Sequence, residues 1–178
     1  MRLLPLEPAT IPLAASWLAS KENYQWLDFG RDLQILTAPL LTAMSKRERL
    51  HLLRLYTPDE GDPPIGLVAL SDISAIHKTA VLWYVLGDKR FGGRSYTTRA
   101  VAELLALGFG QLDLRAVHAW AVEANAPSLA VLEHNGFTPV GRLQQCHEID
   151  GRAHDRLLFE LLRCAAGPQA TGTARRTP

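Results

Sequence analysis

The chain has 178 residues, of which 47% are hydrophobic and 21% charged, the composition of one ordinary globular domain. Its formal net charge of +1 excludes the global basic field of a general nucleic-acid or acidic-membrane binder. Two cysteines, Cys146 and Cys164, lack zinc or redox spacing. We therefore expect a reduced, cytoplasmic setting with neither nucleic acid nor membrane as a partner.

The first half of the chain changes from helical to strand-like patterns. Pro8 and Pro12 frame the start of a helix, and an irregular aromatic stretch follows it. The turn-rich residues 58–64 then predict a hairpin between two strands. The elements expected here are a strand over 2–6, helices over 9–20 and 37–47, and strands over 50–57, 65–73 and 79–86.

The second half alternates helices and strands. Apolar residues at helical spacing indicate a helix around residues 101–108, and residues 114–122 read as a buried strand. Asn125 is a good helix cap, and Gly136 is suited to the helix end. Strands over 137–148 and 156–162 follow, joined by the turn signal Asp150-Gly151. The order predicts one mixed α/β (α+β) domain over residues 1–164 with about seven strands, and a disordered tail over 165–178.

A glycine-containing turn joins the strand over 79–86 to the helix after it. Gly92 and Gly93 allow a close approach of the backbone to an anion, and Lys89, Arg90 and Arg94 add positive charge. In a P-loop, a lysine would stand where Gly93 is. A dinucleotide fingerprint is interrupted at Ser95. A third interpretation is a pyrophosphate cradle for coenzyme A.

Two motifs resemble those of one family, the GNAT superfamily of acyl-CoA-dependent N-acyltransferases. The segment Arg90-Phe91-Gly92-Gly93-Arg94-Ser95 resembles its Gln/Arg-x-x-Gly-x-Gly/Ala loop. Asn125-x-x-Ser128, closed by Gly136-Phe137, is similar to the helix of the branch that contains ribosomal-protein N-terminal acetyltransferases. The resemblance spans residues 1–163 in element order, and its specific part is residues 82–137.

The resemblance implies a fold, a reaction and partners. The sheet would be mostly antiparallel and splayed at the cofactor cleft, with helices on both faces. The activity would be transfer of the acetyl group of acetyl-CoA to a primary amine by direct attack, without a covalent enzyme intermediate and without a metal. The acceptor would be a small-molecule amine or a protein N-terminus, and the protein a monomer or homodimer.

The resemblance also assigns binding residues. Trp26, Asp28 and Phe29 would contact the acceptor, although the two aromatic rings equally suit packing between helices. The residues expected to bind coenzyme A are Val85, Leu86, Arg90, Phe91, Gly92, Gly93, Arg94, Ser95, Tyr96 and Asn125.

The catalytic residues expected are Ser128, as the hydroxyl near the sulfur, and Glu123, as the base. Ser128 equally suits hydrogen bonding at a helix start, and Glu123 suits a solvated rim somewhat better than catalysis. Asp72 has a status similar to that of Glu123, and Tyr84 is expected in the core. Leu132 stands where many superfamily members carry a tyrosine that acts as general acid on the departing thiolate.

Two alternative functions stay open. In the first, an acyltransferase uses a longer acyl-CoA or a carrier-protein thioester as donor. In the second, the chain binds coenzyme A without catalysis, because Leu132 replaces the tyrosine that would protonate the leaving thiolate. A covalent mechanism is disfavoured because Cys146 and His147, neighbours on a strand, point to opposite faces. The polar cluster from His147 to Asp155 is expected to be a solvated hairpin rather than a metal site.

Overall fold

The computed structural model describes residues 1–30 and 33–163. The expected tail, 165–178, and Cys164 lie outside the described residues. Within those residues, no helix combines the length and apolar character needed to cross a bilayer. The elements are β1 (Arg2–Pro5), α1 (Ile11–Leu18), α2 (Lys21–Tyr24), α3 (Ala38–Ser45), β2 (Leu52–Thr57), β3 (Gly66–Ser74), β4 (Thr79–Leu86), the 3-10 helix η1 (Lys89–Phe91), α4 (Tyr96–Gly110), β5 (Ala116–Val122), α5 (Ala126–His134), β6 (Thr138–Ile149) and β7 (Arg152–Leu162).

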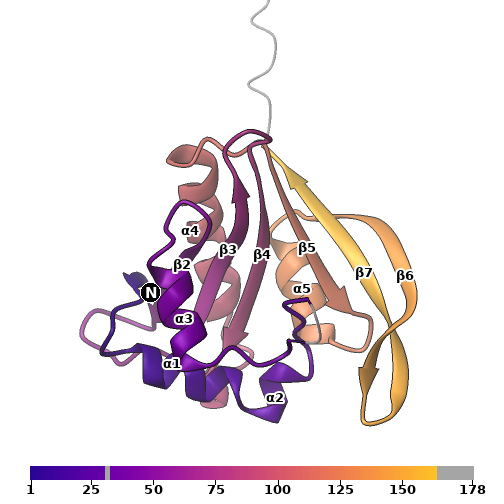
Figure 1. The fold of residues 1–178 in the computed structure, drawn as a ribbon, viewed down its shortest axis with the longest axis horizontal. Helices are drawn as coiled ribbons and strands as arrows, with labels where there is room; N and C mark the ends of the chain where they lie inside the picture. Colours follow the sequence, from indigo (N-terminus) through magenta and orange to yellow (C-terminus); the bar gives the residue numbers. More distant parts are fainter. Residues whose placement is uncertain (31–32, 164–178) are drawn as a thin grey trace, which may run out of the picture.

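The seven strands form one sheet in the order β1-β2-β3-β4-β5-β7-β6. In the described part of the chain, β4 and β5 run parallel and the other neighbouring pairs are antiparallel. Helices α1, α2 and α3 lie on the nearer face of the sheet in Figure 1, and α4 and α5 lie behind it. The prediction of a mixed, mostly antiparallel sheet with helices on both faces is confirmed.

Each face of the sheet has its own apolar core, because side chains alternate between the two faces along a strand. Behind the sheet, Val101 and Leu104 of α4 belong to one buried cluster with Leu82 of β4. In front of it, Leu18 of α1 and Val85 of β4 belong to a second cluster. Strand β4 is therefore held between two helix layers.

Strands β4 and β5 pair only where they begin. Their register comprises Thr79↔Ala116, Ala80↔Val117 and Val81↔His118, and it stops there. In Figure 1 the two strands separate toward the lower edge of the view. The predicted splay of the sheet is present, and it leaves part of the β4 edge without a strand partner on the β5 side.

The expected and observed elements differ most near the N-terminus. The backbone of Ser20 is extended, so the expected helix over 9–20 ends at Leu18, and a separate short helix, α2, begins at Lys21. At the other end, β7 begins at Arg152 rather than 156. Asp150 and Gly151 both have positive φ, 51° and 74°, and this tight turn lets the two strands pair directly beyond it.

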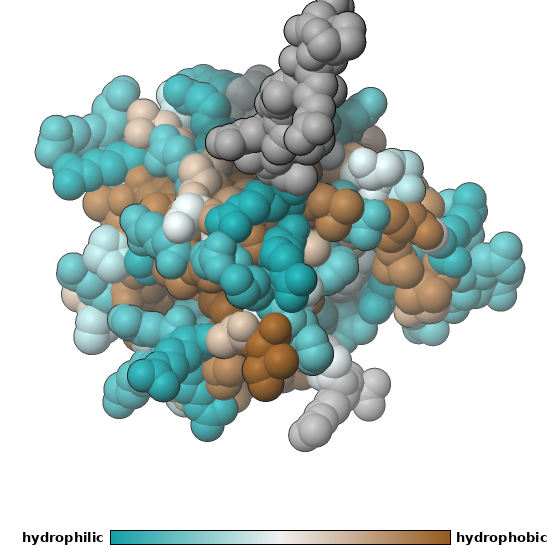
Figure 2. All heavy atoms as spheres, turned by 90° about the horizontal axis from the view of Figure 1, so that it is seen from above, coloured by the Kyte–Doolittle hydropathy of each residue, from teal (hydrophilic) through white to brown (hydrophobic). Residues whose placement is uncertain are grey.

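The surface seen from above has a mixed character. Figure 2 shows hydrophilic side chains spread between hydrophobic ones over this face. Such mixing is ordinary, since apolar atoms contribute more than half of the accessible surface of folded proteins. The gap between β4 and β5 is the more distinctive feature of the molecule.

Candidate active site

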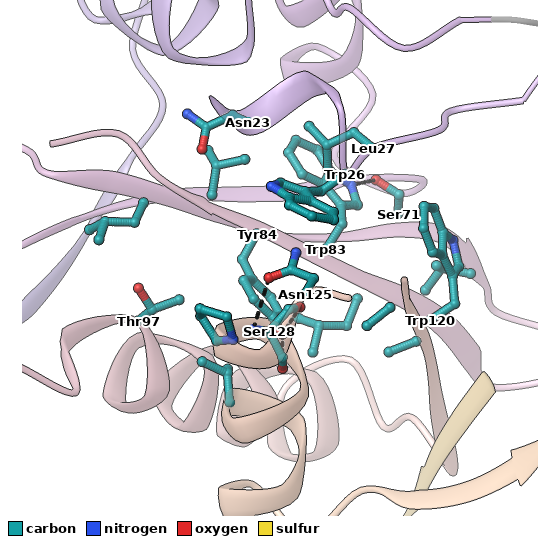
Figure 3. Close-up of a pocket in the computed structure, with 18 of the residues that line it drawn as sticks. Asn23, Trp26, Leu27, Ser71, Trp83, Tyr84, Thr97, Trp120, Asn125 and Ser128 are labelled. Atoms are coloured by element: carbon teal, nitrogen blue, oxygen red, sulfur yellow. Dashed lines mark hydrogen bonds between the residues drawn. The ribbon is translucent and has the colours of Figure 1, made fainter. Parts of the chain in front are cut away.

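A cavity of about 1260 Å³ lies where β4 and β5 diverge. It exceeds the roughly 300–1,000 Å³ of common small-ligand pockets, so it has room for two reactants. Figure 3 shows Trp26 and Trp83 on one side of β4, and Tyr84, Asn125 and Ser128 on the other. The cavity therefore opens toward both faces of the sheet.

The loop between β4 and α4 leaves a row of backbone amides free. Among the described residues, no acceptor is found for the N–H groups of residues 93–97, whereas Arg99 begins the helical pattern by donating to Ser95. The first amides of a helix lack internal partners, and the helix dipole places partial positive charge there. Gly93 has φ +70° and open space where a Cβ would stand. This arrangement suits an anion with several oxygens.

Three of the amides expected in the cradle are already used within the loop. The amide of Arg90 donates to the Asp88 side chain at 3.1 Å, that of Phe91 to the Asp88 carbonyl, and that of Gly92 to the Lys89 carbonyl. The available donors therefore begin at Gly93, three residues later than the sequence interpretation placed them.

Most of the residues expected to bind coenzyme A line the cavity. Arg90 and Arg94 are the exceptions in the set. Arg90 is exposed and pairs with Asp88 at 2.6 Å, and the Arg94 guanidinium lies over the Phe91 ring at 5.6 Å. The members of the set that line the cavity are Val85, Leu86, Phe91, Gly92, Gly93, Ser95, Tyr96 and Asn125.

Tyr56 ties the start of α4 to β4. Its buried hydroxyl donates to the Val85 carbonyl oxygen at 3.2 Å and lies 2.8 Å from the Thr97 hydroxyl. Burial raises the pKa of Tyr56, which keeps the phenol protonated. A side chain at Gly66 would collide with the Tyr56 hydroxyl. No motif or periodicity marked Tyr56, because its role depends on contacts between distant segments.

Two hydroxyl groups meet at the start of α5. The Ser128 hydroxyl lies 2.8 Å from the Tyr84 hydroxyl, and the Tyr84 hydroxyl also reaches the Ser128 carbonyl at 3.0 Å. Burial raises the pKa of Tyr84, so this phenol stays protonated. Asn125 caps the helix by accepting a hydrogen bond from the Ser128 amide at 3.2 Å. Tyr84, which the sequence placed in the core, is thus a partly buried residue that packs against the core and also lines the cavity.

Glu123 lies away from the cavity lining. Its carboxylate pairs with Arg142 at 2.8 Å and accepts a hydrogen bond from the Asp155 amide at 3.3 Å. This ion pair holds Glu123 at the base of the β6–β7 hairpin rather than between β4 and β5, and the position does not favour a role as base. Asp72 does line the cavity.

Trp26, Asp28 and Phe29 line the cavity together, on the side nearer α2 and α3. The Phe29 ring meets Trp83 edge to face, with centroids 5.1 Å apart. Asp28 is already bonded, since its carboxylate accepts from Arg156 at 2.7 Å and from the Gly30 amide at 2.7 Å. Desolvation alone would raise the pKa of Asp28, but these hydrogen bonds lower it below its usual value.

The β6–β7 hairpin reaches back to this side of the cavity through His147 and Arg156. His147 is buried, and its Nε2 lies 2.7 Å from the Gln25 carbonyl oxygen, while Arg156 donates to its Nδ1 at 2.9 Å. The Arg156 guanidinium also lies over the Trp120 ring at 4.2 Å. The prediction of a solvated hairpin is wrong for His147 and Asp155, both of which are buried. His147 packs against the segment after α2, whereas Asp155 is held within the hairpin by Arg142 and the Gln145 amide.

Comparisons with known proteins agree with this geometry. Residues 1–138 match the model of the acetyltransferase (GNAT) domain family. The putative ribosomal N-acetyltransferase YdaF of Bacillus subtilis (strain 168) is 29% identical over 98 residues, which are 55% of this chain and 53% of that protein. The chain spans about half the length of the curated relatives it matches.

Solved structures with the same fold include two named acetyltransferases. Spermidine N-acetyltransferase from Vibrio cholerae, in complex with CoA and spermine, superposes with a TM-score of 0.78 at 18% identity, covering 90% of this chain and 94% of that one. Ribosomal-protein-S5-alanine acetyltransferase from Vibrio fischeri superposes with a TM-score of 0.73 at 19% identity, covering 90% and 91%. With the family model matching most of its length, the chain belongs to the GNAT acetyltransferase family.

Proposed function

We propose that the protein transfers the acetyl group of acetyl-CoA to a primary amine by direct attack. The observation that carries the proposal is the end of β4–β5 pairing at Val81↔His118. Beyond it, one cavity contains the free amides at the start of α4, the Tyr84–Ser128 hydroxyl pair and an aromatic wall. A donor held by its phosphates and an acceptor amine would meet there.

The residues of the cavity fit coenzyme A. The amides of residues 93–97 would hold the pyrophosphate, and Gly93 leaves space for the close approach of its oxygens. The free edge of β4 near Val85 and Leu86 would receive the pantetheine arm, with Asn125 beside it. The V. cholerae structure was solved in complex with CoA, which supports this choice of donor.

The hydroxyl pair suits protonation of the leaving sulfur. Acetyl-CoA supplies a thioester carbonyl that a neutral amine can attack. As the N–C bond forms and the C–S bond breaks, the electron pair moves to sulfur. Ser128 would donate its proton to sulfur, Tyr84 would reprotonate Ser128, and Tyr84 would regain a proton from solvent in the cavity. The raised pKa of Tyr84 keeps the phenol protonated until that transfer. A free thiol has a pKa of about 8.5, so weak acid assistance suffices.

The acceptor must lose a proton on this route. Glu123, in its ion pair with Arg142, does not face the cavity, so we retain Asp72 as the carboxylate that takes this proton through water. Because the nucleophile is the amine itself, the scheme needs no acyl-enzyme. We keep a cytoplasmic setting and a monomer or homodimer as predictions.

The test is release of free thiol from acetyl-CoA in the presence of a panel of primary amines. Amine-dependent release is expected, with an acetyl mass on the amine and none on the protein. Parallel assays with a longer acyl-CoA and an acyl-carrier thioester identify the donor. Binding of acetyl-CoA without any amine-dependent thiol release would contradict the proposed activity and favour a non-catalytic coenzyme-binding protein.

A further inference from the structure

The acceptor side of the cavity is built from large aromatic rings. Of the four tryptophans in the chain, Trp26, Trp83 and Trp120 line this cavity together with Ser128. Trp83 and Trp120 come from the two diverging strands, and Trp26 comes from the segment after α2. In Figure 3 Trp26 lies against Trp83 on the side of β4 opposite Ser128. A molecule that reaches Ser128 from this side would pass between aromatic faces.

The aromatic wall is held in place before any acceptor arrives. The Trp83 indole N–H donates to the Ser71 hydroxyl at 2.9 Å, and the Phe29 ring packs edge-on against Trp83. Trp120 is covered by the guanidinium of Arg156, which is itself fixed by Asp28 and His147. A preformed apolar pocket binds flat apolar groups without first paying for side-chain ordering.

The charges of the cavity do not suit a second positive charge on the acceptor. Its acidic lining residues are Glu22, Asp28 and Asp72, and its basic ones are Arg47, Lys89 and Arg156. Asp28, the acid within the aromatic wall, is already neutralised by Arg156 and bonded to a backbone amide. With acidic and basic lining residues equal in number, the cavity has no acidic excess to hold the additional ammonium groups of a polyamine, and burying one without a partner costs free energy.

Resting on the proposed function, we propose that the acceptor is a monoamine whose primary amino group is carried on a flat apolar body, an aromatic ring or a group of similar shape. The body would lie among Trp26, Trp83 and Trp120 while the amine extends between β4 and β5 toward Ser128. Stacking against aromatic rings would provide the affinity. The paired Asp28 would position Arg156 rather than attract the amine.

The experiment compares kcat/KM for 2-phenylethylamine, tryptamine, spermidine and an alanine-initiated peptide, with acetyl-CoA as donor at one pH. We expect the two aromatic amines to exceed spermidine and the peptide by about tenfold or more. A second readout without catalysis is intrinsic fluorescence, because three tryptophans line the cavity. 2-Phenylethylamine, which carries no indole fluorophore of its own, should quench it at lower concentrations than spermidine.

A pair of variants tests the contact itself. Trp26→Ala should raise KM for 2-phenylethylamine roughly threefold to tenfold, with acetyl-CoA affinity unchanged and with partial recovery in Trp26→Phe. The matched control is Tyr24→Ala, an aromatic residue two positions earlier that does not line the cavity. It should leave KM unchanged.

Each contrary outcome is distinct. Turnover of spermidine or the peptide at least as efficient as that of the aromatic amines overturns this inference and leaves the proposed acetyl transfer standing. An equal rise of KM in the Trp26 and Tyr24 variants also overturns it. Absence of thiol release with every amine overturns it as well, and a parallel acetyl-CoA titration then shows whether coenzyme binding fails too.

Discussion

Ser95 occupies a backbone conformation that glycine adopts more readily. Its φ is +58°, in the left-handed region, and its side chain makes no cap hydrogen bond to α4. A side chain in this region costs about 1–2 kcal/mol relative to the right-handed form. The resembling loop carries Gly or Ala at this place, and of the two only Gly avoids this strain. The serine keeps its backbone N–H available to the cavity.

The first prediction is that Ser95→Gly stabilises the protein. The free energy of unfolding in urea should rise by roughly 0.5–1 kcal/mol, because the strain disappears and no hydrogen bond is lost. Ser20→Gly is the control, since Ser20 has an extended backbone, φ −73°, and likewise makes no cap hydrogen bond. There the flexible unfolded glycine should lower stability by a few tenths of a kcal/mol. A loss of stability in both variants would refute the strain at Ser95.

The second prediction concerns the hydroxyl pair. Tyr84→Phe and Ser128→Ala should each lower kcat by a factor on the order of 10², with acetyl-CoA affinity unchanged, because each breaks the path of the proton to sulfur. The double variant should be no slower than the slower single variant, since residues that act as a unit are not additive. Additive losses in steady-state kinetics would mean that the two hydroxyls act separately.

Among individual residues, sequence spacing located those site residues whose partners lie close by in the chain. Asn125, Ser128 and Gly93 were located because helix caps and glycine turns have local signatures. Tyr84, Arg156 and His147 were not assigned to the site, since their partners are 44, 128 and 122 residues away. Only the tertiary fold creates those contacts.

The β6–β7 hairpin and the segment after α2 form one side of the cavity by holding each other. His147 contacts the Gln25 carbonyl, Arg156 bonds both His147 and Asp28, and Lys21 pairs with Asp150 at 2.6 Å. Burial lowers the pKa of His147, as does the charge of Arg156, although the hydrogen bond to Gln25 acts in the opposite direction. His147 is therefore neutral in the folded protein near pH 7.

The third prediction follows from that shift. Below the unfolded histidine pKa of about 6.5, His147 binds a proton in the unfolded chain but stays neutral in the folded chain. The contribution of His147 to the free energy of unfolding is therefore fully present above this pH and is lost as the pH drops toward the lower folded pKa. Its slope is at most about 1.4 kcal/mol per pH unit. Urea unfolding from pH 7.5 to 5 should show the loss, and His147→Gln should reduce its slope.

The exposed His118 provides the control for this measurement. His118→Gln should keep the wild-type slope, because it removes a histidine without touching the contact between the hairpin and Gln25. An identical slope in wild type, His147→Gln and His118→Gln would show that the hairpin contact does not govern the acid sensitivity.

Elements with a strong local pattern were predicted well. The strand over Thr79–Leu86 was placed with its observed bounds, and the helix capped by Asn125 begins and ends as its cap and Gly136 indicate. The short α2 was missed because four residues are too few to show a period. The parallel pairing of β4 with β5, and the residue at which it stops, depend on packing against both helix layers, which no local pattern encodes.

On the scale of the whole molecule, the sheet carries one buried apolar cluster on each face, and pairing between β4 and β5 stops at Val81↔His118. The start of α4 presents the free amides on one face, and the α1–α3 face presents the aromatic wall. Because β4 and β5 stop pairing at Val81↔His118, both groups of residues border one cavity that also contains Ser128. In the proposed function, donor and acceptor would occupy these two sides, so their separation would follow from the sheet rather than from any one motif.

The most direct test is a calorimetric titration of acetyl-CoA into the wild type, Gly93→Glu and Gly61→Glu. Gly61 is the matched control, because it also has a positive φ, +85°, and open space at its Cβ, but lies in the β2–β3 turn. The titration should give the same Kd for the wild type and Gly61→Glu, and in a companion urea unfolding a hundredfold excess of acetyl-CoA over that Kd should stabilise both by about 2.7 kcal/mol. Gly93→Glu should bind at least about tenfold more weakly, because bulk and negative charge then fill the anion cradle. Wild-type affinity in Gly93→Glu would contradict the phosphate assignment at the start of α4.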